Sequence, residues 1–556
     1  MKYLSRVFLA SLTLAAIFFL SGCQGLVAGG GPVTPPVTPP PVTPPPPPPP
    51  AAKPSTVTIT EDGSGSGGVT STPAGIDCGS TCTAKFADGD ITLTAAPGPS
   101  FVFTGWSGAC TGTDLTCVIP AGSTATANVT FTATLQSINH IIFTFQENRS
   151  FDHYFGHMND YRQNLGLDPD VDGTPGNASN PSYDQMSTVE PFHMHSKCVE
   201  NPSPSWNESH VDFNRDNPVS GTFQGNGFVR TAAHDAINTG MADTLGIRAM
   251  GYYDGNDLNY YYFLATNFAM SDRWFAPMMS RTQPNRLYMV AATSDGHVYP
   301  PAFGTKVNRK TIFELLEEKG ITWRVYVPEA HPTLIEGSEM VMFPFSNQHP
   351  NNFVLAETFK DDVNNGTLAQ VSFIDAGSFS GKDEHPADDP SMPGGSVQQG
   401  ADYVQHAYID PLINSPSWKD SVFILSWDEH GGFYDHVAPQ PAVAPDNVAV
   451  QDFMPGDICS VVDGPTCGFK HTGYRVPMML ISPFAKKNYV SHAVADHTAI
   501  LKFIETRFGL TNLTERDKAQ IDMSTEFFDF VNAPWATPPP STPMQTKAGP
   551  CLLSLP

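Results

Sequence analysis

Two polar pairs follow directly on apolar, strand-like runs, and they offer the residue types best suited to chemistry. The first pair is Glu147 with Asn148, and the second is Asp428 with Glu429. Because a buried strand that ends in carboxylates delivers them to the carboxyl edge of a sheet, we expect both pairs in one site. Carboxylates gathered there repel one another and are costly to desolvate, and a bound cation relieves both costs. The pattern therefore predicts metal-assisted enzyme chemistry.

A hydroxyl residue, Thr282, stands just ahead of a stretch that predicts a helix. Pro284 suits the first turn of that helix, so Thr282 is expected at the N-cap or just before it. Two interpretations stay open at this point. Thr282 is either only a cap, or a hydroxyl that faces a phosphate held by the backbone N–H groups and the helix dipole.

The net charge of the chain limits the kinds of molecule that it can bind. The 556 residues include 55 Asp and Glu against 30 Lys and Arg, which gives a net charge of −25. No basic stripe is present to neutralise phosphates, so the composition argues against nucleic acid as a partner. It also disfavours electrostatic adsorption to anionic lipid heads, but it leaves zwitterionic lipids possible as a substrate.

The N-terminus predicts export. Lys2 and Arg6 precede the apolar stretch 7–20, which is too short for a comfortable membrane span. The stretch ends in Leu-Ser-Gly-Cys23, which resembles the bacterial lipobox. That resemblance implies a signal peptide at 1–23 and lipidation of Cys23, so the protein is expected to be exported and lipid-anchored to a bacterial membrane or cell surface. An ordinary cleavable signal with an incidental cysteine is the alternative.

The cysteine count agrees with an oxidising compartment. Nine cysteines are present, and setting Cys23 aside leaves eight for pairing. Three pairs are close enough in sequence for local loops: Cys78 with Cys82, Cys110 with Cys117, and Cys459 with Cys467. Cys198 and Cys551 are then left over, although the sequence does not fix the connectivity.

Composition divides the rest of the chain. Residues 24–54 form a Pro-rich segment that predicts an extended polyproline linker. Residues 55–135 carry short alternating runs separated by Gly and Pro turns, which predicts a small all-β module. The surroundings of Cys78 and the segment 101–110 resemble the InlB-type B-repeat domains of bacterial surface proteins.

The largest domain is expected at 136–535, with a poorly patterned tail at 536–556. A short amphipathic helix ended by Gly320 leads into the apolar strand 321–327, and a further strand is expected within 473–483. Helices that alternate with buried strands predict an α/β fold with a largely parallel central sheet.

Three motifs of this domain, taken together, resemble the bacterial phosphoesterase family of phospholipases C and related acid phosphatases. They are ENRSFDHYFG from Glu147, TQPNR from Thr282 and DEHGGFYDHV from Asp428. The resemblance spans essentially the whole domain and keeps the family's order. It implies an alkaline-phosphatase-like α/β sandwich.

The resemblance also implies roles for the residues singled out above. Thr282 would be the nucleophile and a metal ligand, and the other ligands would be Glu147, Asn148, Asp428 and Glu429. Oxygen ligands suit a divalent cation, with calcium, magnesium and zinc all open. Thr282 would attack phosphorus in line, the alcohol would leave, and water would then hydrolyse the phosphothreonine.

Further residues would assist that reaction. His385 matches a family histidine and would protonate the leaving alkoxide as general acid. Asn285 would bind the substrate phosphate, and Arg286 could do the same; either could instead fix the loop. Asp435 and His436 would orient the second acidic pair from behind.

One departure from the family concerns a histidine that lipase-type members often carry just before a Trp. Pro204 stands in that place here, and His210 is the nearest residue that could supply a similar imidazole to the substrate. An aromatic-rich segment, 252–263, precedes the nucleophile; core packing or a cage for a choline cation would each explain it.

Three functions remain for the whole chain. The first is an exported phospholipase C that converts glycerophospholipids to diacylglycerol and a phosphorylated headgroup. The second is an acid phosphatase that hydrolyses phosphomonoesters in the same site. The third is a surface adhesin, which the linker and the β-module suggest.

Overall fold

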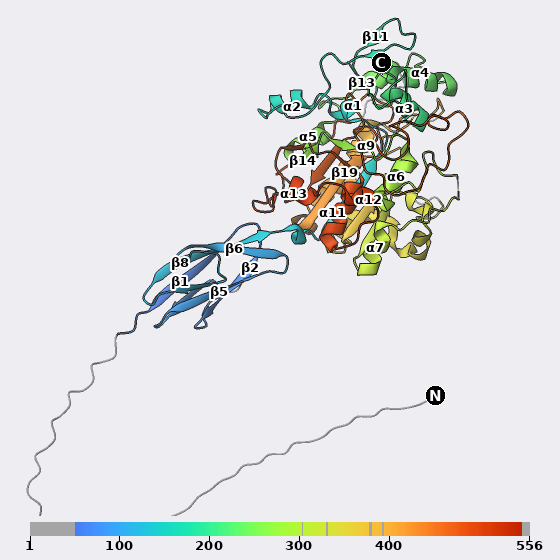
Figure 1. The fold of residues 1–556 in the computed structure, drawn as a ribbon. Coiled ribbons are helices and arrows are strands. Elements are labelled where there is room, and N and C mark those ends of the chain that lie inside the picture. Colours follow the sequence, from blue (N-terminus) through green and yellow to red (C-terminus); the bar gives the residue numbers. More distant parts are fainter. Residues whose placement is uncertain are drawn as a thin grey trace, which may run out of the picture. The chain divides into compact units, whose positions relative to one another are not determined.

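The computed structural model of the chain describes residues 51–547, except 80, 303, 330–331, 377–380 and 392–393 (Figure 1). The predicted signal peptide, Cys23 and nearly all of the predicted linker lie outside the described residues, as does Cys551. The domain boundaries stay predictions.

The N-terminal part of the described chain is all β. Its eight strands form two four-stranded sheets, β4-β1-β8-β6 and β3-β2-β5-β7. Val57 and Ile59 alternate inward along β1 and are buried with Trp106 in a core of their own. Two disulfides close short loops, Cys78–Cys82 and Cys110–Cys117, as predicted. The strands are β1 (Ser55–Asp62), β2 (Gly67–Thr72), β3 (Asp77–Cys78), β4 (Thr83–Phe86), β5 (Ile91–Pro97), β6 (Phe101–Gly108), β7 (Thr116–Ile119) and β8 (Thr124–Ala133).

The central sheet of the larger part has eight strands in the order β17-β16-β18-β9-β19-β20-β14-β21. Five neighbouring pairs are parallel, but β20 runs antiparallel to both β19 and β14, so the sheet is mixed. The strands are β9 (His140–Gln146), β14 (Ala269–Ser271), β16 (Trp323–Val327), β17 (Phe353–Leu355), β18 (Val371–Ile374), β19 (Ser421–Trp427), β20 (Met478–Ile481) and β21 (Tyr489–Ser491). Three two-stranded sheets pair β10 (Asn180–Pro181) with β11 (Thr188–Val189), β12 (Phe192–His193) with β13 (Gly251–Tyr252), and β15 (Trp274–Phe275) with β22 (Ala495–Asp496).

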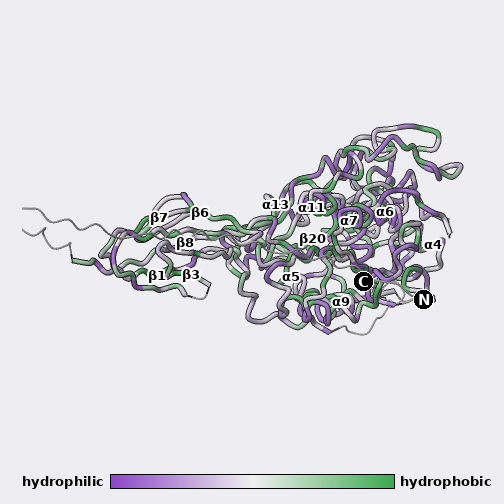
Figure 2. The backbone as a smooth tube through the Cα atoms, turned by 90° about the horizontal axis from the view of Figure 1, so that it is seen from below, coloured by the Kyte–Doolittle hydropathy of each residue, from purple (hydrophilic) through white to green (hydrophobic). Residues whose placement is uncertain are grey.

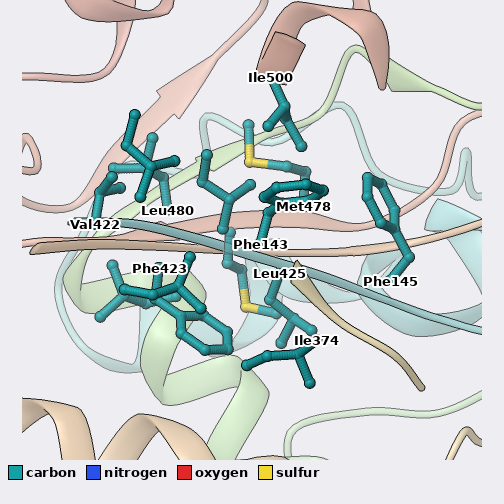
Figure 3. Close-up of a cluster of buried hydrophobic side chains, with 14 of the residues drawn as sticks. Phe143, Phe145, Ile374, Val422, Phe423, Leu425, Met478, Leu480 and Ile500 are labelled. Carbon is teal, nitrogen blue, oxygen red and sulfur yellow. The ribbon is translucent and has the colours of Figure 1, made fainter. Parts of the chain in front are cut away.

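The middle of this sheet is buried on both faces, as its apolar sequence runs require. Every residue of β19 and β20 is buried. Figure 2 shows the backbone coloured by the hydropathy of each residue, with β20 labelled. Figure 3 shows apolar side chains above and below the strands, with Ile500 of α11 on one side and Phe423 and Leu425 on the other. Helix α5 packs on the second face, where Tyr261 meets Trp427 at 5.3 Å between ring centroids.

Helices fill the segments between the strands. Helix α7 confirms the predicted stop: Thr311 accepts a hydrogen bond from the Glu314 N–H at its start, and Gly320 ends it with φ of 71°. No helix among the described residues is long and apolar enough to cross a bilayer. The helices are α1 (Phe151–Phe155), α2 (Met158–Asn164), α3 (Trp206–Phe213), α4 (Phe228–Thr239), α5 (Asn259–Asn267), α6 (Thr282–Ala291), α7 (Ile312–Lys319), α8 (Phe359–Asn365), α9 (Val397–Val404), α10 (Asp410–Ile413), α11 (Thr498–Phe508), α12 (Glu515–Lys518) and α13 (Met523–Glu526).

Candidate active site

Three adjacent parallel strands deliver a carboxylate each to the same edge of the sheet. Asp375 follows β18, Glu147 follows β9 and Asp428 follows β19. In the register of β9 and β19, Gln146 pairs with Trp427, so Glu147 and Asp428 are the next residues of the two strands. The expectation that the two polar pairs meet at one edge is therefore met.

A single guanidinium lies among these strand ends. Arg286 of α6 places Nη2 3.0 Å from Glu147 Oε1, Nη1 3.5 Å from Asp375 Oδ1 and Nε 3.6 Å from Asp428 Oδ2. Burial alone would lower the pKa of Arg286, but the surrounding carboxylates raise it. Arg286 therefore neutralises carboxylates here; of the two roles left open for it, these contacts correspond to fixing the site rather than to binding phosphate.

Backbone N–H groups hold the second polar pair in place. Asp428 Oδ1 accepts hydrogen bonds from the Asn148 N–H at 2.9 Å and from the Glu429 N–H at 2.7 Å. Glu429 Oε2 accepts one from the Gly431 N–H at 2.7 Å. Asn148 has φ of 59°, a left-handed conformation that asparagine tolerates better than most residues. The two loops are thus fixed against each other.

The opposite oxygens of these carboxylates are buried and have no hydrogen-bond partner: Asp428 Oδ2 and Glu429 Oε1. Burial, reinforced by neighbouring carboxylates, raises the pKa of both Asp428 and Glu429 to about 8. Ionised Glu147, Asp428 and Glu429 would carry three negative charges against the one positive charge of Arg286. A divalent cation fits that excess and those unpartnered oxygens.

Thr282 is the first residue of α6, and Arg281 is the N-cap, so the helix starts one residue earlier than a Thr282 cap would give. Thr282 Oγ1 lies 3.5 Å from Asn148 Oδ1, at the long limit of a hydrogen bond. The structure therefore brings the predicted nucleophile to the predicted metal ligands. The first-turn N–H groups of α6 have no partner within the helix and can face an anion.

Asn285 fixes the approach to Thr282. Its side-chain amide donates to the backbone carbonyl of Ser280 at 2.8 Å and accepts from the Met278 N–H at 3.0 Å. The side chain is fully buried. Of the two roles open to Asn285, these contacts correspond to fixing the loop.

His385 reaches the same group of residues from the segment after β18. Its Nε2 lies 3.2 Å from Asn148 Nδ2 and 3.9 Å from Glu147 Oε2. Its Nδ1 lies 2.6 Å from the carbonyl oxygen of Pro386, which fixes a proton on Nδ1 and turns Nε2 toward the site. The ring is 19% exposed, so it is open to solvent and substrate.

Glu384, next to His385, is a positioning residue that the sequence reasoning missed. Its buried carboxylate accepts hydrogen bonds from Tyr154 Oη and Tyr261 Oη, both at 2.6 Å, and from Trp427 Nε1 at 3.1 Å. Its φ is 71°. The only sequence signal is a carboxylate in an aromatic-rich domain, and nothing in the spacing connects it to these partners.

Asp435 and His436 lie in a separate buried network that joins both acidic loops. Arg475 donates to Asp435 Oδ1 and to Asp152 Oδ1, each at 2.9 Å, and His436 Nδ1 lies 2.7 Å from Asp152 Oδ2. We call Asp152, Asp435, His436 and Arg475 the loop clamp. These bonds hold Asp435 and His436 to Arg475 and Asp152, and their predicted role of orienting Asp428 and Glu429 stays a prediction.

His210 does not join the other site residues. It lies in α3, where its ring stacks on Trp206 at 4.1 Å between centroids. Both ring nitrogens face backbone carbonyls, Nδ1 that of Trp206 at 2.7 Å and Nε2 that of Thr466 at 3.2 Å. Burial lowers the pKa of His210 to about 4, so the ring is neutral and donates its single N–H to one of these two carbonyls.

Two other groups of metal-type ligands lie close together, and each already holds a cation. Asp152, Asp435 and His436 place one ligand atom each within 4.8 Å of one another, but the Arg475 guanidinium lies between the two aspartates. The second group is His193, Asp254 and Asp257, where the Lys197 ammonium pairs with Asp257. A metal ion in either place would be repelled by the resident charge.

The aromatic segment before Thr282 is mostly core. Tyr253, Tyr260, Tyr261 and Tyr262 are all fully buried. Their packing, with Tyr261 against Trp427 and Tyr262 against Phe155, accounts for these four rings, and no open cage forms among them.

Comparison with known proteins identifies the family of this chain. The Phosphoesterase family model matches residues 138–511, and the chain belongs to that family. Phospholipase C B of Mycobacterium tuberculosis is 30% identical over 452 residues, covering 74% of this chain and 80% of that relative. Hemolytic phospholipase C of Pseudomonas aeruginosa is 30% identical over 457 residues, covering 72% of this chain and 57% of that relative. The protein is therefore a hydrolase that acts on phosphoric esters.

Solved structures are more distant. Phosphonate monoester hydrolase from Silicibacter pomeroyi superposes with a TM-score of 0.24 and 10% sequence identity, covering 46% of this chain and 69% of that chain. A score this low carries no conclusion about the fold.

Proposed function

We propose that this protein is a phospholipase C that hydrolyses glycerophospholipids to diacylglycerol and a phosphorylated headgroup. The observation that carries the chemistry is a threonine hydroxyl at a helix N-terminus, 3.5 Å from the Asn148 side chain. Asn148 is in turn hydrogen-bonded through its backbone to Asp428, and Asp428 and Glu429 each keep one buried oxygen without a hydrogen-bond partner. The similarity to two proteins named phospholipase C supports the lipid substrate.

In this proposal Thr282 Oγ1 loses its proton to solvent and attacks phosphorus, and the diacylglycerol alkoxide leaves on the opposite side. First-turn N–H groups of α6 stabilise negative charge on the transferring oxygens. His385, whose Nε2 faces the site, delivers the proton to the leaving oxygen when its ring is protonated, and afterwards accepts one from the attacking water. That water releases the headgroup phosphate from the phosphothreonine.

Glu147, Asn148, Asp428 and Glu429 would hold a divalent cation together with Thr282, and its identity among calcium, magnesium and zinc is left open. When bound, the ion would lower the pKa of the threonine hydroxyl and neutralise developing charge. Arg286 keeps Glu147 and Asp428 from repelling each other. Asn285 holds the turn that presents Thr282.

The remaining expectations complete the proposal. The catalytic domain adopts an alkaline-phosphatase-like sandwich, which the helices found on both faces of the central sheet support. The chain is exported and anchored through lipidated Cys23, and the Pro-rich linker and the β-module separate the anchor from the catalytic domain.

The test compares the full chain with Thr282→Ala and with the matched control Thr282→Ser, which keeps the hydroxyl. Each is incubated with phosphatidylcholine and with p-nitrophenyl phosphate in the presence of calcium, magnesium or zinc. Diacylglycerol that disappears in Thr282→Ala and persists in Thr282→Ser is the expected result. Thr282-dependent nitrophenol without diacylglycerol would reassign the protein to the acid phosphatases. Turnover of neither substrate would favour the adhesin.

A further inference from the structure

A loop beside α3 presents an unusual set of exposed apolar side chains. Within residues 454–463, which we call the tip loop, Val461 is 90% exposed, Val462 is 61% exposed and Met454 is 60% exposed. Single exposed apolar residues are ordinary on protein surfaces. Here the two valines are consecutive, and exposed apolar groups that gather in this way mark a surface that meets another apolar phase.

A disulfide and hydrogen bonds from α3 order the tip loop. The Cys459–Cys467 disulfide closes the turn that carries Val461 and Val462. Asn207 of α3 donates to Asp457 Oδ1 at 2.8 Å and accepts from the Ile458 N–H at 2.9 Å, and the Trp206 indole donates to the Ile458 carbonyl at 3.0 Å. A loop ordered before binding loses little conformational entropy when it binds.

The same anchor connects the tip loop to the nucleophile. Trp206 packs in one apolar cluster with Met278 and Tyr288. Met278 is hydrogen-bonded to Asn285, which also holds the turn leading to Thr282, and Tyr288 lies on α6 itself. The tip loop is therefore anchored on α3, and the apolar cluster around Trp206 links that anchor to the helix that carries Thr282.

The net charge of the segment around the tip loop determines which kind of lipid surface the loop can bind. The segment 443–469 contains no Lys, Arg or His, and it contains four acidic residues, Asp446, Asp452, Asp457 and Asp463. An anionic lipid surface attracts basic clusters and would repel this segment. A zwitterionic lipid interface neither attracts nor repels it strongly, so burial of the valine and methionine side chains would decide binding.

We propose that the tip loop inserts into the interface of a zwitterionic phospholipid bilayer and so brings the Thr282 site to its lipid substrate. This inference rests on the proposed phospholipase function and adds the surface through which the catalytic domain meets the membrane. Insertion is driven by apolar burial, so raising the salt concentration from 50 to 500 mM should not weaken it.

The test uses the full chain with Cys23→Ser in every sample, so that lipidation cannot contribute. The loop variant is Val461→Asp with Val462→Asp, and the matched control is Val531→Asp, a valine 65% exposed outside the tip loop. Activity on dispersed, short-chain phosphatidylcholine below its micelle concentration reports whether each variant is folded. The loop variant should keep that activity and lose about 10-fold or more of its activity on phosphatidylcholine vesicles, because aspartate is costly to place in an apolar interface.

A second measurement reads the loop directly and does not depend on turnover. Val461→Trp and, as control, Val531→Trp are mixed with vesicles of brominated phosphatidylcholine, and tryptophan emission is recorded. Quenching at position 461 but not at 531, unchanged by salt, is the expected result. Equal quenching at both positions, or none at 461, overturns the proposal, as does equal vesicle activity of the loop variant and the parent.

The two failures can be told apart. If the parent does not hydrolyse dispersed phosphatidylcholine, the proposed function fails, and the quenching experiment still decides whether the tip loop enters lipid. Stronger quenching by vesicles rich in anionic lipid than by zwitterionic vesicles would contradict the assignment of the partner.

Discussion

Two buried clusters of carboxylates involve the loops that follow β9 and β19. The two clusters differ in how far their negative charge is neutralised. In the loop clamp, Arg475 donates to both Asp152 and Asp435, and His436 pairs with Asp152. In the cluster near Arg286, by contrast, Asp428 and Glu429 each keep one oxygen that has no hydrogen-bond partner. Both clusters are drawn from ENRSFDHYFG and DEHGGFYDHV.

The difference separates a structural role from a chemical one. Closely grouped ligand atoms alone would point to the clamp, since Asp152, Asp435 and His436 lie within 4.8 Å of one another. Charge balance and unpartnered oxygens point instead to Glu147, Asp428 and Glu429, because burial of unneutralised carboxylates is costly unless a further cation binds. The predictions below challenge this distinction.

The largest effect is expected for Asp428→Asn. The amide keeps the shape and the backbone hydrogen bonds of Oδ1 but removes the charge a cation needs, so kcat should fall about 10³-fold or more. The free energy of unfolding of the metal-free protein should stay within about 1 kcal/mol of the parent, because Arg286 keeps Glu147 and Asp375 as counter-charges when the charge of Asp428 is removed. Activity assays measure the change in kcat, and urea denaturation measures the change in the free energy of unfolding. A large loss of stability would give Asp428 a structural role like that of the loop clamp.

His385→Gln should lower kcat on phosphatidylcholine about 10²–10⁴-fold, the usual contribution of a general acid. The loss should be much smaller with p-nitrophenyl phosphorylcholine, because nitrophenolate is a stable leaving group that needs no proton. Steady-state kinetics on both substrates measure the ratio. An equal loss on both would assign His385 to binding or positioning.

Arg475→Met should destabilise the protein by about 3–5 kcal/mol, because it leaves the buried Asp152 and Asp435 without their counter-charge. The fraction that folds should lose only about 10–100-fold in turnover, as for residues that orient metal ligands. Urea denaturation and activity per folded molecule test this. A loss of activity as large as that of Asp428→Asn, without a loss of stability, would reverse the comparison.

The smallest expected effect is on the pH dependence of thermal stability, with and without a divalent metal ion. Burial raises the pKa of Asp428 and Glu429 to about 8, whereas an unfolded carboxyl titrates near 4. The metal-free protein therefore loses stability as pH rises from about 4 toward 8, since ionisation is easier in the unfolded chain. A divalent ion requires the ionised carboxylates, so it should raise the Tm more at pH 8 than at pH 5.5. Thermal melts with metal or with chelator check this, and Asp428→Asn should reduce the difference.

The sequence predicted the parts of the site that depend on local pattern and strand order. Apolar runs ending in Glu147 and Asp428 predicted strands whose carboxyl ends meet, and β9 and β19 are indeed neighbours in register. The helix after Thr282 and the helix stop at Gly320 followed from proline and glycine signals. Three local disulfides followed from cysteine spacing.

Partners chosen by tertiary packing could not be predicted in the same way. Arg286 binds carboxylates that follow three different strands, and Glu384 binds tyrosines more than 100 residues away. His210 has a residue type that fits the site, yet its ring faces carbonyls of α3 and the segment near Thr466. Such choices depend on which surfaces meet in the folded domain, and residue spacing carries no record of them.

The strand arrangement also fixes when the site can exist during synthesis. Asn148 and Asp428, joined by a hydrogen bond, are 280 residues apart in the chain. A ribosome must therefore make most of the catalytic domain before the two halves of the site can meet, and closing so long a loop slows folding. A nascent or truncated chain that stops before residue 428 has no complete cation site. The protein thus becomes competent for catalysis only at a late stage of its own production.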